Sequence, residues 1–596
     1  MKFLLAAVNA KYIHSNLAVF SLKAYAEAQP RESRTEVEIA EYTINQPEDL
    51  ILADLFRRRP DAVGFSCYLW NREAVSRLTA DLHQILPEVP VWLGGPEVSF
   101  DCEKVLEEMP GVTGIMVGEG ERTFDRLLSF YEGRGRLEDI PGLAYRQGER
   151  VRLQPPEEPM DLSRVPFPYP DLKEFENRIL YYESSRGCPF SCSYCLSSVD
   201  KRLRFRDLEL VKEELGRFLE ARVPQVKFVD RTFNCRKSHA MAIWQFIREH
   251  DNGVTNFHFE VGADLLDAEE LALLAQMRPG QVQLEIGVQS TNPDTLREIR
   301  RSASFEKIRE NAEQVRSFGN IHQHLDLIAG LPFEGYDRFG QSFDEVYRLE
   351  PDQLQLGFLK VLKGSFLYEN RDAYGLRYQS NPVYEVLGTS WLSYGEIIRL
   401  KGIEEVVEIY YNSGQFRLTL RYLEHFFPSA FAMYEKLAAF YEETAVPGQS
   451  FSRNGRYERM LAFAGAQLPE ETERIKALLT CDLYLREPVK SRPAFAGDIS
   501  GWKEEASSRL RRLWEAEQED GKKELSWRQF IHDTHMECFA WDPEALARGQ
   551  EAVPGEYWYW FDYRLRDPKS GNARICRLEN EKTGGKGTFQ KRGNPI

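Results

Sequence analysis

The sequence predicts an α/β protein that continues into a mostly helical region. Short apolar runs alternate with helical patterns over residues 1–148, the same rhythm returns over residues 179–365, and it stops after residue 365. A chain of 596 residues is long enough for several domains, at roughly 150 residues per domain. Apolar residues make up 42% and charged residues 29% of the chain, which is typical of folded proteins.

The first region, residues 1–148, is expected to form a Rossmann-like, doubly wound parallel sheet of about five strands. The expected strands are 2–8, 37–39, 62–66, 91–94 and 113–117. Ligands of such sheets bind beyond the carboxyl ends of the strands. The loops at those ends supply the candidate ligand contacts of this region: His14, Asn16, Ser66, Gly94, Gly95, Pro96, Glu97, Gly118, Glu119 and Gly120.

A proline-rich segment separates the first region from the second. Six of the sixteen residues from Pro155 to Pro170 are proline, and proline favours extended backbone and blocks regular helix. We therefore expect a linker over residues 149–178.

The second region, residues 179–365, contains six further βα repeats. Its expected strands are 181–185, 226–230, 257–261, 282–287, 322–328 and 353–360. Because a closed barrel of this kind has eight repeats, six repeats predict a partial (β/α)6 barrel.

The third region, residues 366–596, carries apolar residues at helical spacing and is expected to be mostly helical. Two segments differ from that pattern. Residues 557–565 (YWYWFDYRL) are strand-like, and the tail from Lys582 is expected to be disordered. His535, Glu537 and Cys538 are expected to be structural, since adjacent positions on one strand or helix rarely converge on a metal.

Three cysteines stand close together after the first strand of the second region. Cys188, Cys192 and Cys195 form the pattern C-x3-C-x2-C. A loop this short can wrap three thiolates around one face of an iron–sulfur cube and leave the fourth iron open. A zinc knuckle would need four ligands, and the nearest histidines in the sequence, His83 and His239, are far from the loop.

The triplet, with the aromatic Tyr194 directly before its last cysteine, resembles the signature of the radical S-adenosylmethionine (SAM) superfamily. The resemblance implies that Cys188, Cys192 and Cys195 bind a 4Fe-4S cluster. In that family the open iron binds SAM, and an electron from the cluster cleaves SAM to a 5′-deoxyadenosyl radical. The resemblance to this superfamily continues through FVDRTFN (228–234), FEVGADLL (259–266), LEIGVQSTN (284–292), HLDLIAGLPFEG (324–335) and GFLKVLKG (357–364).

Polar residues and turns at the strand ends of a partial barrel are where its chemistry is placed. The candidates for contacts to SAM, beside Tyr194, are Asp230, Glu285, Gln289, Gly330 and Pro332. For any single one of them a capping or core-rim hydrogen bond is an equally good interpretation.

The first region, with WLGGPEVS (92–99) and GEGERTF (118–124), resembles the cobalamin-binding domain of cobalamin-dependent radical SAM enzymes. The D-x-H-x-x-G motif of many cobalamin folds is absent after the first strand, where the chain reads NAKYIHSNLA. We therefore expect base-off cobalamin without a histidine lower ligand, with His14 and Asn16 ordering their loop. The radical SAM methylthiotransferases also resemble this layout, but they need three cysteines in the first domain, and only Cys67 and Cys102 lie there.

These resemblances imply a radical SAM enzyme, most plausibly a methyltransferase that acts on an unactivated carbon through methylcobalamin. One alternative keeps both cofactors for a cyclisation, rearrangement or oxidation without methyl transfer. A cobalamin- or redox-sensing binding protein is an alternative from another class. The third region resembles an uncharacterised domain found after this core in bacterial radical SAM proteins, so it names no substrate.

The net charge and the cysteines indicate which binding partners and which cellular compartment to expect. The net charge of -16 argues against general binding to nucleic acid. No run of 18 apolar residues is present, so no membrane-spanning helix is expected. Three of the nine cysteines lie within eight residues, which favours metal binding in a reducing compartment, and we expect a cytoplasmic protein. The resemblance also implies an electron donor such as flavodoxin or ferredoxin, and an unknown substrate.

Overall fold

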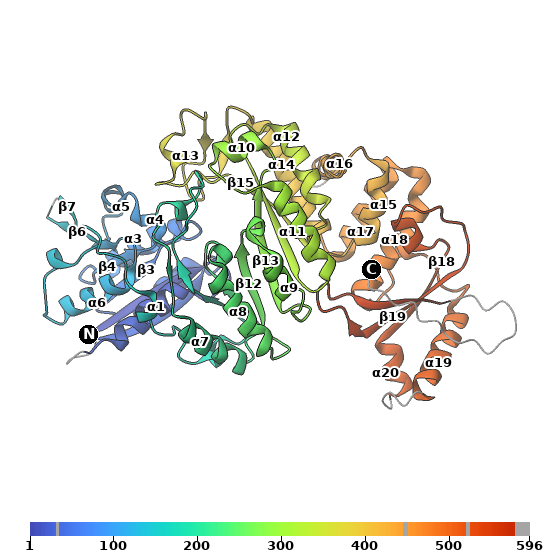
Figure 1. Ribbon diagram of the computed structural model, residues 1–596, viewed down its shortest axis with the longest axis horizontal. Coiled ribbons are helices and arrows are strands. Elements are labelled where there is room, and N and C mark those ends of the chain that lie inside the picture. The colour runs from blue at the N-terminus through green and yellow to red at the C-terminus, as the bar shows by residue number, and fades with distance from the viewer. Residues whose placement is uncertain (31–34, 149, 445–450, 520–524, 579–596) are drawn as a thin grey trace. The chain divides into compact units, whose positions relative to one another are not determined.

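The computed structural model describes residues 1–30, 35–148, 150–444, 451–519 and 525–578 (Figure 1). The chain packs into two compact units. Unit 1 comprises Met1–Gln323, Ile328–Gly335 and Gly357–Ser393, and unit 2 comprises His324–Leu327, Tyr336–Leu356 and Tyr394–Ile596.

A seven-stranded sheet opens unit 1, with the strand order β2-β1-β3-β4-β5-β6-β7. The strands from β2 to β5 pair in parallel, and β6 and β7 pair antiparallel at one edge. The strands are β1 (Lys2–Asn9), β2 (Glu36–Thr43), β3 (Ala62–Ser66), β4 (Val91–Gly94), β5 (Gly114–Met116), β6 (Leu143–Gln147) and β7 (Arg150–Leu153).

Helices cover both faces of this sheet. Because side chains alternate along a strand, Leu4 and Val8 of β1 lie in one core with α2, α3 and α5, whereas Phe3 and Ala7 lie in a second core with α1 and α6. This confirms the doubly wound class. The helices are α1 (Leu17–Ala28), α2 (Glu48–Arg57), α3 (Arg72–Ile85), α4 (Pro96–Ser99), α5 (Cys102–Glu108) and α6 (Gly120–Tyr131).

The edge hairpin β6–β7 was not expected from the sequence. The alternation of polar and apolar residues in β7 (RVRL) covers only four positions, and β7 is largely exposed. An edge strand needs a buried partner on one side only, so its sequence carries a weak signal. After β7 and before β8, the described backbone forms only the 3-10 helices η2 (Leu162–Arg164) and η3 (Leu172–Phe175).

The second sheet has six strands in the order β15-β14-β13-β12-β11-β8. Strands β8, β11, β12 and β13 pair in parallel, as the predicted partial barrel requires. The strands are β8 (Ile179–Tyr182), β11 (Gln225–Phe228), β12 (Asn256–Val261), β13 (Val282–Gln289), β14 (His322–Ala329) and β15 (Gln353–Phe358). The helices that alternate with them are α7 (Leu208–Glu220), α8 (Lys237–Glu249), α9 (Ala268–Leu274), α10 (Pro293–Glu298), α11 (Phe305–Phe318) and α12 (Tyr336–Tyr347).

Unit 1 also contains the segment Gly357–Ser393, with α13 (Phe366–Glu369), β16 (Arg377–Tyr378) and β17 (Val386–Gly388). This segment packs on the rest of the unit. The Leu367 amide donates to the Ser193 carbonyl across 2.9 Å, and a side chain at Gly364 would collide with Phe100.

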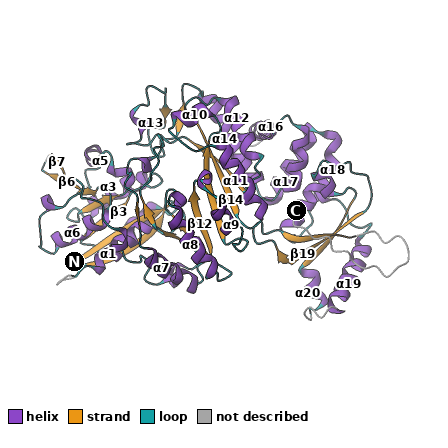
Figure 2. Ribbon diagram, in the orientation of Figure 1, coloured by secondary structure: helices purple, strands orange, loops and turns teal. Residues whose placement is uncertain are grey.

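Unit 2 is mostly helical, as expected, and Figure 2 shows its helices in purple. Its helices after residue 393 include α14 (Tyr394–Val407), α15 (Arg417–Leu423), α16 (Ala430–Thr444), α17 (Arg453–Gln467), α18 (Thr472–Arg486), α19 (Lys503–Glu519), α20 (Trp527–His532) and α21 (Pro543–Ala547). They are joined by an antiparallel sheet of β18 (Thr534–Phe539), β19 (Tyr557–Arg566) and β20 (Ala573–Leu578). The aromatic segment predicted as a strand is β19, and the tail from Lys582 lies outside the described residues.

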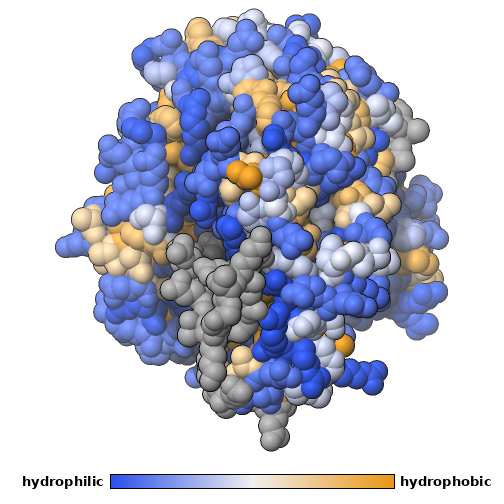
Figure 3. Space-filling view, turned by 90° about the vertical axis from the view of Figure 1, so that its right-hand side faces the viewer, coloured by the Kyte–Doolittle hydropathy of each residue, from blue (hydrophilic) through white to orange (hydrophobic). Residues whose placement is uncertain are grey.

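The face drawn in Figure 3 is largely hydrophilic, with apolar side chains in small separate groups. Among the described helices, none combines the length and the apolar character needed to cross a membrane.

Candidate functional site

The three cysteines lie on one loop with a closed base. This cysteine loop, residues 187–203, connects β9 (Ser185–Arg186) to β10 (Arg204–Phe205), which pair antiparallel. At its base Gly187 has φ +96, and a Cβ there would lie 2.7 Å from the Arg202 carbonyl oxygen. Glycine is therefore required where the two ends of the loop meet.

The thiols of the loop are close enough to influence one another. Cys188 and Cys192 are buried and Cys195 is half-buried. Burial raises the pKa of the Cys188 thiol, and the neighbouring Cys195 and Cys192 raise it further. Within the described ranges, no group of three His, Cys, Asp or Glu side chains converges as around a single metal ion. A cubane cluster does not need such convergence, because its three thiolates bind three different irons. Ligation of a cluster by this loop therefore remains a prediction.

Polar atoms without partners gather beside Cys192. Arg301 Nη1 lies 3.9 Å from Cys192 Sγ, and Arg301 also donates to the Gly287 carbonyl. A Cβ on Gly287 would lie 2.1 Å from Gln289 Nε2 and 3.7 Å from Arg301 Nη2, so both side chains lie against Gly287. Arg301 Nε, Gln289 Oε1 and Ser193 Oγ are buried and, among the described residues, have no hydrogen-bond partner.

Such unpartnered atoms fit a small polar ligand, because a buried polar group normally has a partner. The amino and carboxylate groups of SAM would supply those partners. Gln289 is a predicted contact, whereas Arg301 and Ser193 were missed. Ser193 stands inside the cysteine motif, so its position alone was a usable signal, but Arg301 follows α10 and carries no motif of its own. Burial also raises the pKa of the predicted contact Tyr194.

Asp230 is buried among hydrogen-bond donors that precede the cysteine loop. Its carboxylate accepts from the Ser184 amide at 3.0 Å and from the hydroxyls of Ser184 and Ser185 at 2.6 Å. Burial raises the pKa of Asp230 to about 6, although these hydrogen bonds oppose the shift. The structure thus turns Asp230 toward the chain that leads into the loop, and its predicted contact to SAM stays a prediction.

Glu285 lies in an ionic cluster that spans three strands. Its carboxylate is 2.9 Å from Lys227 Nζ on β11 and 2.8 Å from His258 Nε2 on β12. Burial alone would raise the pKa of Glu285, but the hydrogen bond from His258 and the Lys227 ammonium lower it to about 2. The Gly330-Leu331-Pro332 turn packs instead against α10 and β17. The Thr295 hydroxyl of α10 donates to the Pro332 carbonyl, and Val386 of β17 lies beside Gly330.

His14 and Asn16 hold the loop that follows β1. His14 Nδ1 is 2.8 Å from the Tyr181 hydroxyl. Asn16 caps α1 by accepting from the Val19 amide, and its side-chain amide donates to Asn9 and to the Ser66 hydroxyl at 3.1 Å. These bonds order the carboxyl ends of β1 and β3 beside each other.

The glycines after β4 and β5 differ in what surrounds them. Gly95 has φ +114, and a Cβ there would be 2.4 Å from the Cys67 carbonyl oxygen, so β3 and the β4–α4 turn touch. Gly118 has φ +80 with open space around it. Gly94 precedes this turn, Pro96 begins α4, and Glu97 on α4 accepts from the Tyr384 hydroxyl.

Exposed apolar side chains surround the same strand ends. Tyr12 after β1 is 75% exposed, Trp70 after β3 is 44% exposed and Phe100 after β4 is 40% exposed. Aromatic side chains with open space at the carboxyl ends of a doubly wound sheet suit a large, flat, partly apolar ligand. A corrin ring has that character, so the residues present fit cobalamin.

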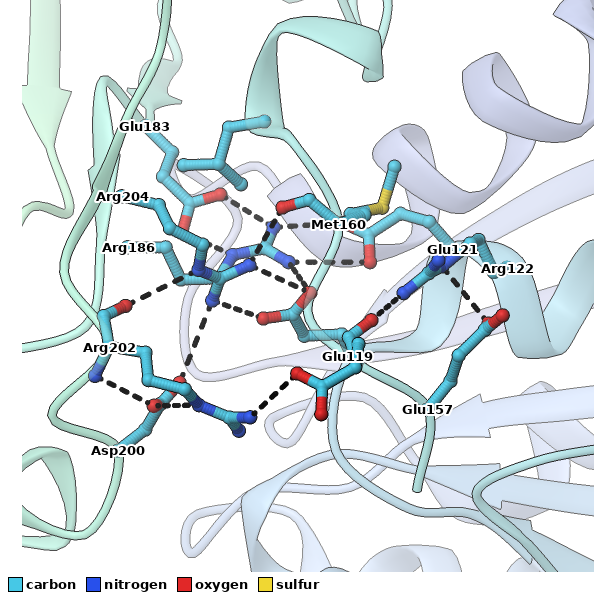
Figure 4. A network of polar contacts seen from close by, with 12 residues as sticks. Glu119, Glu121, Arg122, Glu157, Met160, Glu183, Arg186, Asp200, Arg202 and Arg204 are labelled. Atoms are coloured by element: carbon cyan, nitrogen blue, oxygen red, sulfur yellow. Dashed lines mark hydrogen bonds and ion pairs between the residues drawn. The ribbon is translucent and has the colours of Figure 1, made fainter. Parts of the chain in front are cut away.

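Glu119, a predicted cobalamin contact, is instead held by arginines of the cysteine loop base. Figure 4 shows Glu119, directly before α6, and Glu121, in the first turn of α6, facing Arg186 and Arg204. Gly120 begins α6, and a Cβ there would press on Leu22 of α1. The base of the cysteine loop is thus bonded to the start of α6.

The comparisons with known proteins agree with this arrangement. The B12 binding domain family matches residues 4–128, and the Radical SAM superfamily matches residues 182–346. A third family, described as a protein of unknown function (DUF4080), matches residues 372–558.

Curated relatives align with part of the chain. An uncharacterized methyltransferase of Pyrococcus horikoshii is 26% identical over 54% of this chain and 72% of its own length. The cobalamin-dependent radical SAM methyltransferase TokK of Streptomyces tokunonensis is 27% identical over 60% of this chain and 55% of its own. An anaerobic magnesium-protoporphyrin IX monomethyl ester cyclase of Synechocystis is 28% identical over 49% and 60%. The chain thus spans less than two thirds of the last two.

Solved structures share the fold. The cobalamin-dependent SAM radical enzyme OxsB, with aqua-cobalamin bound, has a TM-score of 0.58 at 16% identity over 89% of this chain and 82% of its own. The radical SAM methyltransferase TsrM of Kitasatospora setae, with cobalamin and a [4Fe-4S] cluster bound, has a TM-score of 0.53 at 19% identity over 64% and 82%. The chain therefore contains, in this order, regions that match the B12 binding domain, the Radical SAM superfamily and DUF4080.

Proposed function

We propose that this chain is a cobalamin-dependent radical SAM enzyme that transfers a methyl group to an unactivated carbon. The observation that carries the proposal is the pair of ion pairs, within unit 1, that join Arg186 and Arg204 at the two ends of the cysteine loop to Glu121 and Glu119 at the start of α6 in the B12 binding domain. A reaction that uses two cofactors needs both of their loops held at one place. The methyltransferases among the relatives support the choice of reaction.

Different residues of the chain bind the cluster, SAM and cobalamin. Cys188, Cys192 and Cys195 hold the 4Fe-4S cluster, while Gln289 and Arg301 bind and orient the polar end of SAM. When bound, the cluster supplies the electron that cleaves SAM, and cobalamin carries the methyl group. The loops after β1, β3, β4 and β5 hold the corrin and exclude water from its face.

Cobalamin binds base-off and without histidine below the cobalt. His14 is held by the Tyr181 hydroxyl at 2.8 Å, which supports a role in ordering its loop. Burial lowers the pKa of His14, and Lys11, Lys227 and Arg178 lower it further.

The proposed enzyme has three domains and a linker, takes its electron from a small redox protein, and works in the cytoplasm. The cobalamin domain spans 1–148, the linker 149–178, the radical SAM core 179–365 and the C-terminal domain 366–596. Reduced flavodoxin or ferredoxin supplies the electron. The cysteines of the described chain form no disulfide, which suits the cytoplasm as a reducing compartment.

The test uses the full chain, purified without oxygen and with hydroxocobalamin, then reduced and mixed with SAM. We expect both 5′-deoxyadenosine and S-adenosylhomocysteine to form. Cys192→Ala should abolish 5′-deoxyadenosine, whereas Cys235→Ala, outside the triplet, should retain it. Absence of S-adenosylhomocysteine under every condition would refute methyl transfer.

One alternative is favoured by a specific observation, the cyclase among the relatives. In that case the chain uses both cofactors for a cyclisation, rearrangement or oxidation. Formation of 5′-deoxyadenosine without S-adenosylhomocysteine, together with a product that has gained no methylene, would favour this alternative.

A further inference from the structure

Two arginines mark the ends of the cysteine loop. Arg186 on β9 is the last residue before the loop, and Arg204 on β10 is the first residue after it. The two residues are register partners in the β9–β10 pair. Any force on these side chains therefore acts on the base of the loop that carries the cysteines.

Both arginines bind glutamates of the B12 binding domain. Arg186 Nη2 donates to Glu121 Oε1 at 2.8 Å, and Arg204 Nη1 donates to Glu119 Oε2 at 3.1 Å (Figure 4). Arg186 also binds Glu183 at 2.7 Å, and Arg204 also donates to the Met160 carbonyl at 3.0 Å. We call Glu119, Glu121, Arg186 and Arg204 the loop-base network.

Burial makes the loop-base network strong and specific. The Glu121 side chain is only 6% exposed and the Arg186 side chain 21%. Burial alone would raise the pKa of Glu121, but the Arg186 guanidinium lowers it overall. Losing one partner of such a pair leaves the other charge buried without compensation, which strongly destabilises the arrangement.

Glu119 belongs to the loop that is predicted to face cobalamin, and Glu121 lies in the first turn of the helix that follows it. Glu119 and Glu121 flank Gly120 at the start of α6, and they follow Gly118, which has open space around it. A displacement of this loop would move the base of the cysteine loop, because buried ion pairs join the two.

We propose that Arg186 and Arg204 are positioning residues that fix the cysteine loop on the β5–α6 loop and so couple cobalamin binding to the cluster site. The coupling rests on the proposed function, whereas the positioning of the loop does not. Linkage requires the effect to be reciprocal: if the cluster changes the affinity for cobalamin, cobalamin changes the stability of the cluster site by the same factor.

The first experiment tests positioning in the full chain without cofactors, by hydrogen exchange of the peptide that covers residues 187–203. Arg186→Gln and Glu121→Gln should speed exchange of this peptide about tenfold or more. Arg186→Lys keeps the charge but loses the forked contacts, so it should fall between Arg186→Gln and the wild type. The matched control is Arg178→Gln, which breaks another buried contact to the first sheet, Arg178 with Glu41 at 2.6 Å.

Equal exchange in Arg186→Gln and the wild type would overturn the positioning proposal. An equal increase at residues 187–203 in Arg178→Gln would do the same, because it would show general loosening. Thermal unfolding shows whether each variant folds. If Arg186→Gln does not fold, Glu121→Gln takes its place.

The second experiment tests coupling by titrating hydroxocobalamin into protein with and without its reconstituted cluster. The two affinities should differ about fivefold or more in the wild type and by less than about twofold in Arg186→Gln. Equal affinities in the wild type, or an undiminished difference in Arg186→Gln, would overturn the coupling. If the wild type binds no cobalamin, the proposed function fails, while hydrogen exchange still decides the positioning.

Discussion

The Arg301 guanidinium lies 3.9 Å from the sulfur of Cys192, although 109 residues separate them in the sequence. Arg301 reaches this position by donating to the carbonyl of Gly287, at the carboxyl end of β13. A residue of the barrel thereby meets a predicted cluster ligand, and its Nε atom is left without a partner among the described residues.

Arg301→Gln should lower SAM cleavage about tenfold or more without changing the iron content. Losing a charged hydrogen bond to a buried ligand costs about 1.5–3 kcal/mol. The assay is the rate of 5′-deoxyadenosine formation, and Arg297→Gln is the matched control, since Arg297 is exposed and paired with Asp294. Equal loss in both variants would rule out a specific role for Arg301.

Gly287→Ala should weaken SAM binding but leave the cluster in place. The new Cβ would lie 2.1 Å from Gln289 Nε2, so Gln289 must move. SAM binding is measured by equilibrium dialysis and the cluster by its visible absorbance. Gly216→Ala in α7, where no atom lies within 4 Å of the new Cβ, should leave both unchanged. A Gly287→Ala protein that binds SAM normally would contradict the placement of the SAM site.

His14→Ala should leave the visible spectrum of bound cobalamin unchanged and weaken its binding only severalfold. His14 is bonded to Tyr181, so its loss loosens a loop and removes no ligand of cobalt. Tyr181→Phe should weaken binding similarly, because it removes the same contact. Loss of a nitrogen-coordination signature in His14→Ala alone would show that His14 binds the cobalt.

The free energy of unfolding of unit 2 should fall as the pH rises, because of Asp482. Its carboxylate is buried and accepts from the Leu418 and Thr419 amides and the Thr419 hydroxyl. Burial raises its pKa to about 7 in spite of these bonds. The folded state then holds a proton that the unfolded state has released above pH 4, so stability falls as pH rises through the folded pKa.

The size of this effect follows from the same pKa. Between pH 5 and pH 8 the free energy of unfolding should fall by about 2–3 kcal/mol relative to Asp482→Asn, which cannot titrate. Urea unfolding at several pH values measures it. Parallel curves for the two proteins would contradict the raised pKa.

The strands were predictable because apolar alternation and runs report burial along a strand. β3 and β4 have the limits expected from the sequence, and β19 was visible in its aromatic residues. The edge hairpin β6–β7 was missed because both strands are short and the edge strand β7 is largely exposed, so its four-residue pattern is a weak signal. The strands β18 and β20, which flank β19, were not expected either.

The candidate site was less predictable than the fold. The sequence places Asp230 and Glu119 at element ends and Glu285 within a strand, but it does not show what each one faces. Lys227 lies 58 residues from Glu285, and Arg204 lies 85 residues from Glu119. Partners so distant are set by the pairing of strands and the contact between the two sheets, which no local pattern encodes.

The joint action of cobalamin and the cluster is tested most directly by the metal content of one anaerobic preparation of the full chain, reconstituted with iron, sulfide and hydroxocobalamin. We expect about four irons and about one cobalt per chain, with iron lost in Cys192→Ala and cobalt retained. Iron without cobalt would leave a radical SAM protein whose first domain has another role. That result would contradict the proposal that cobalamin and the cluster act together.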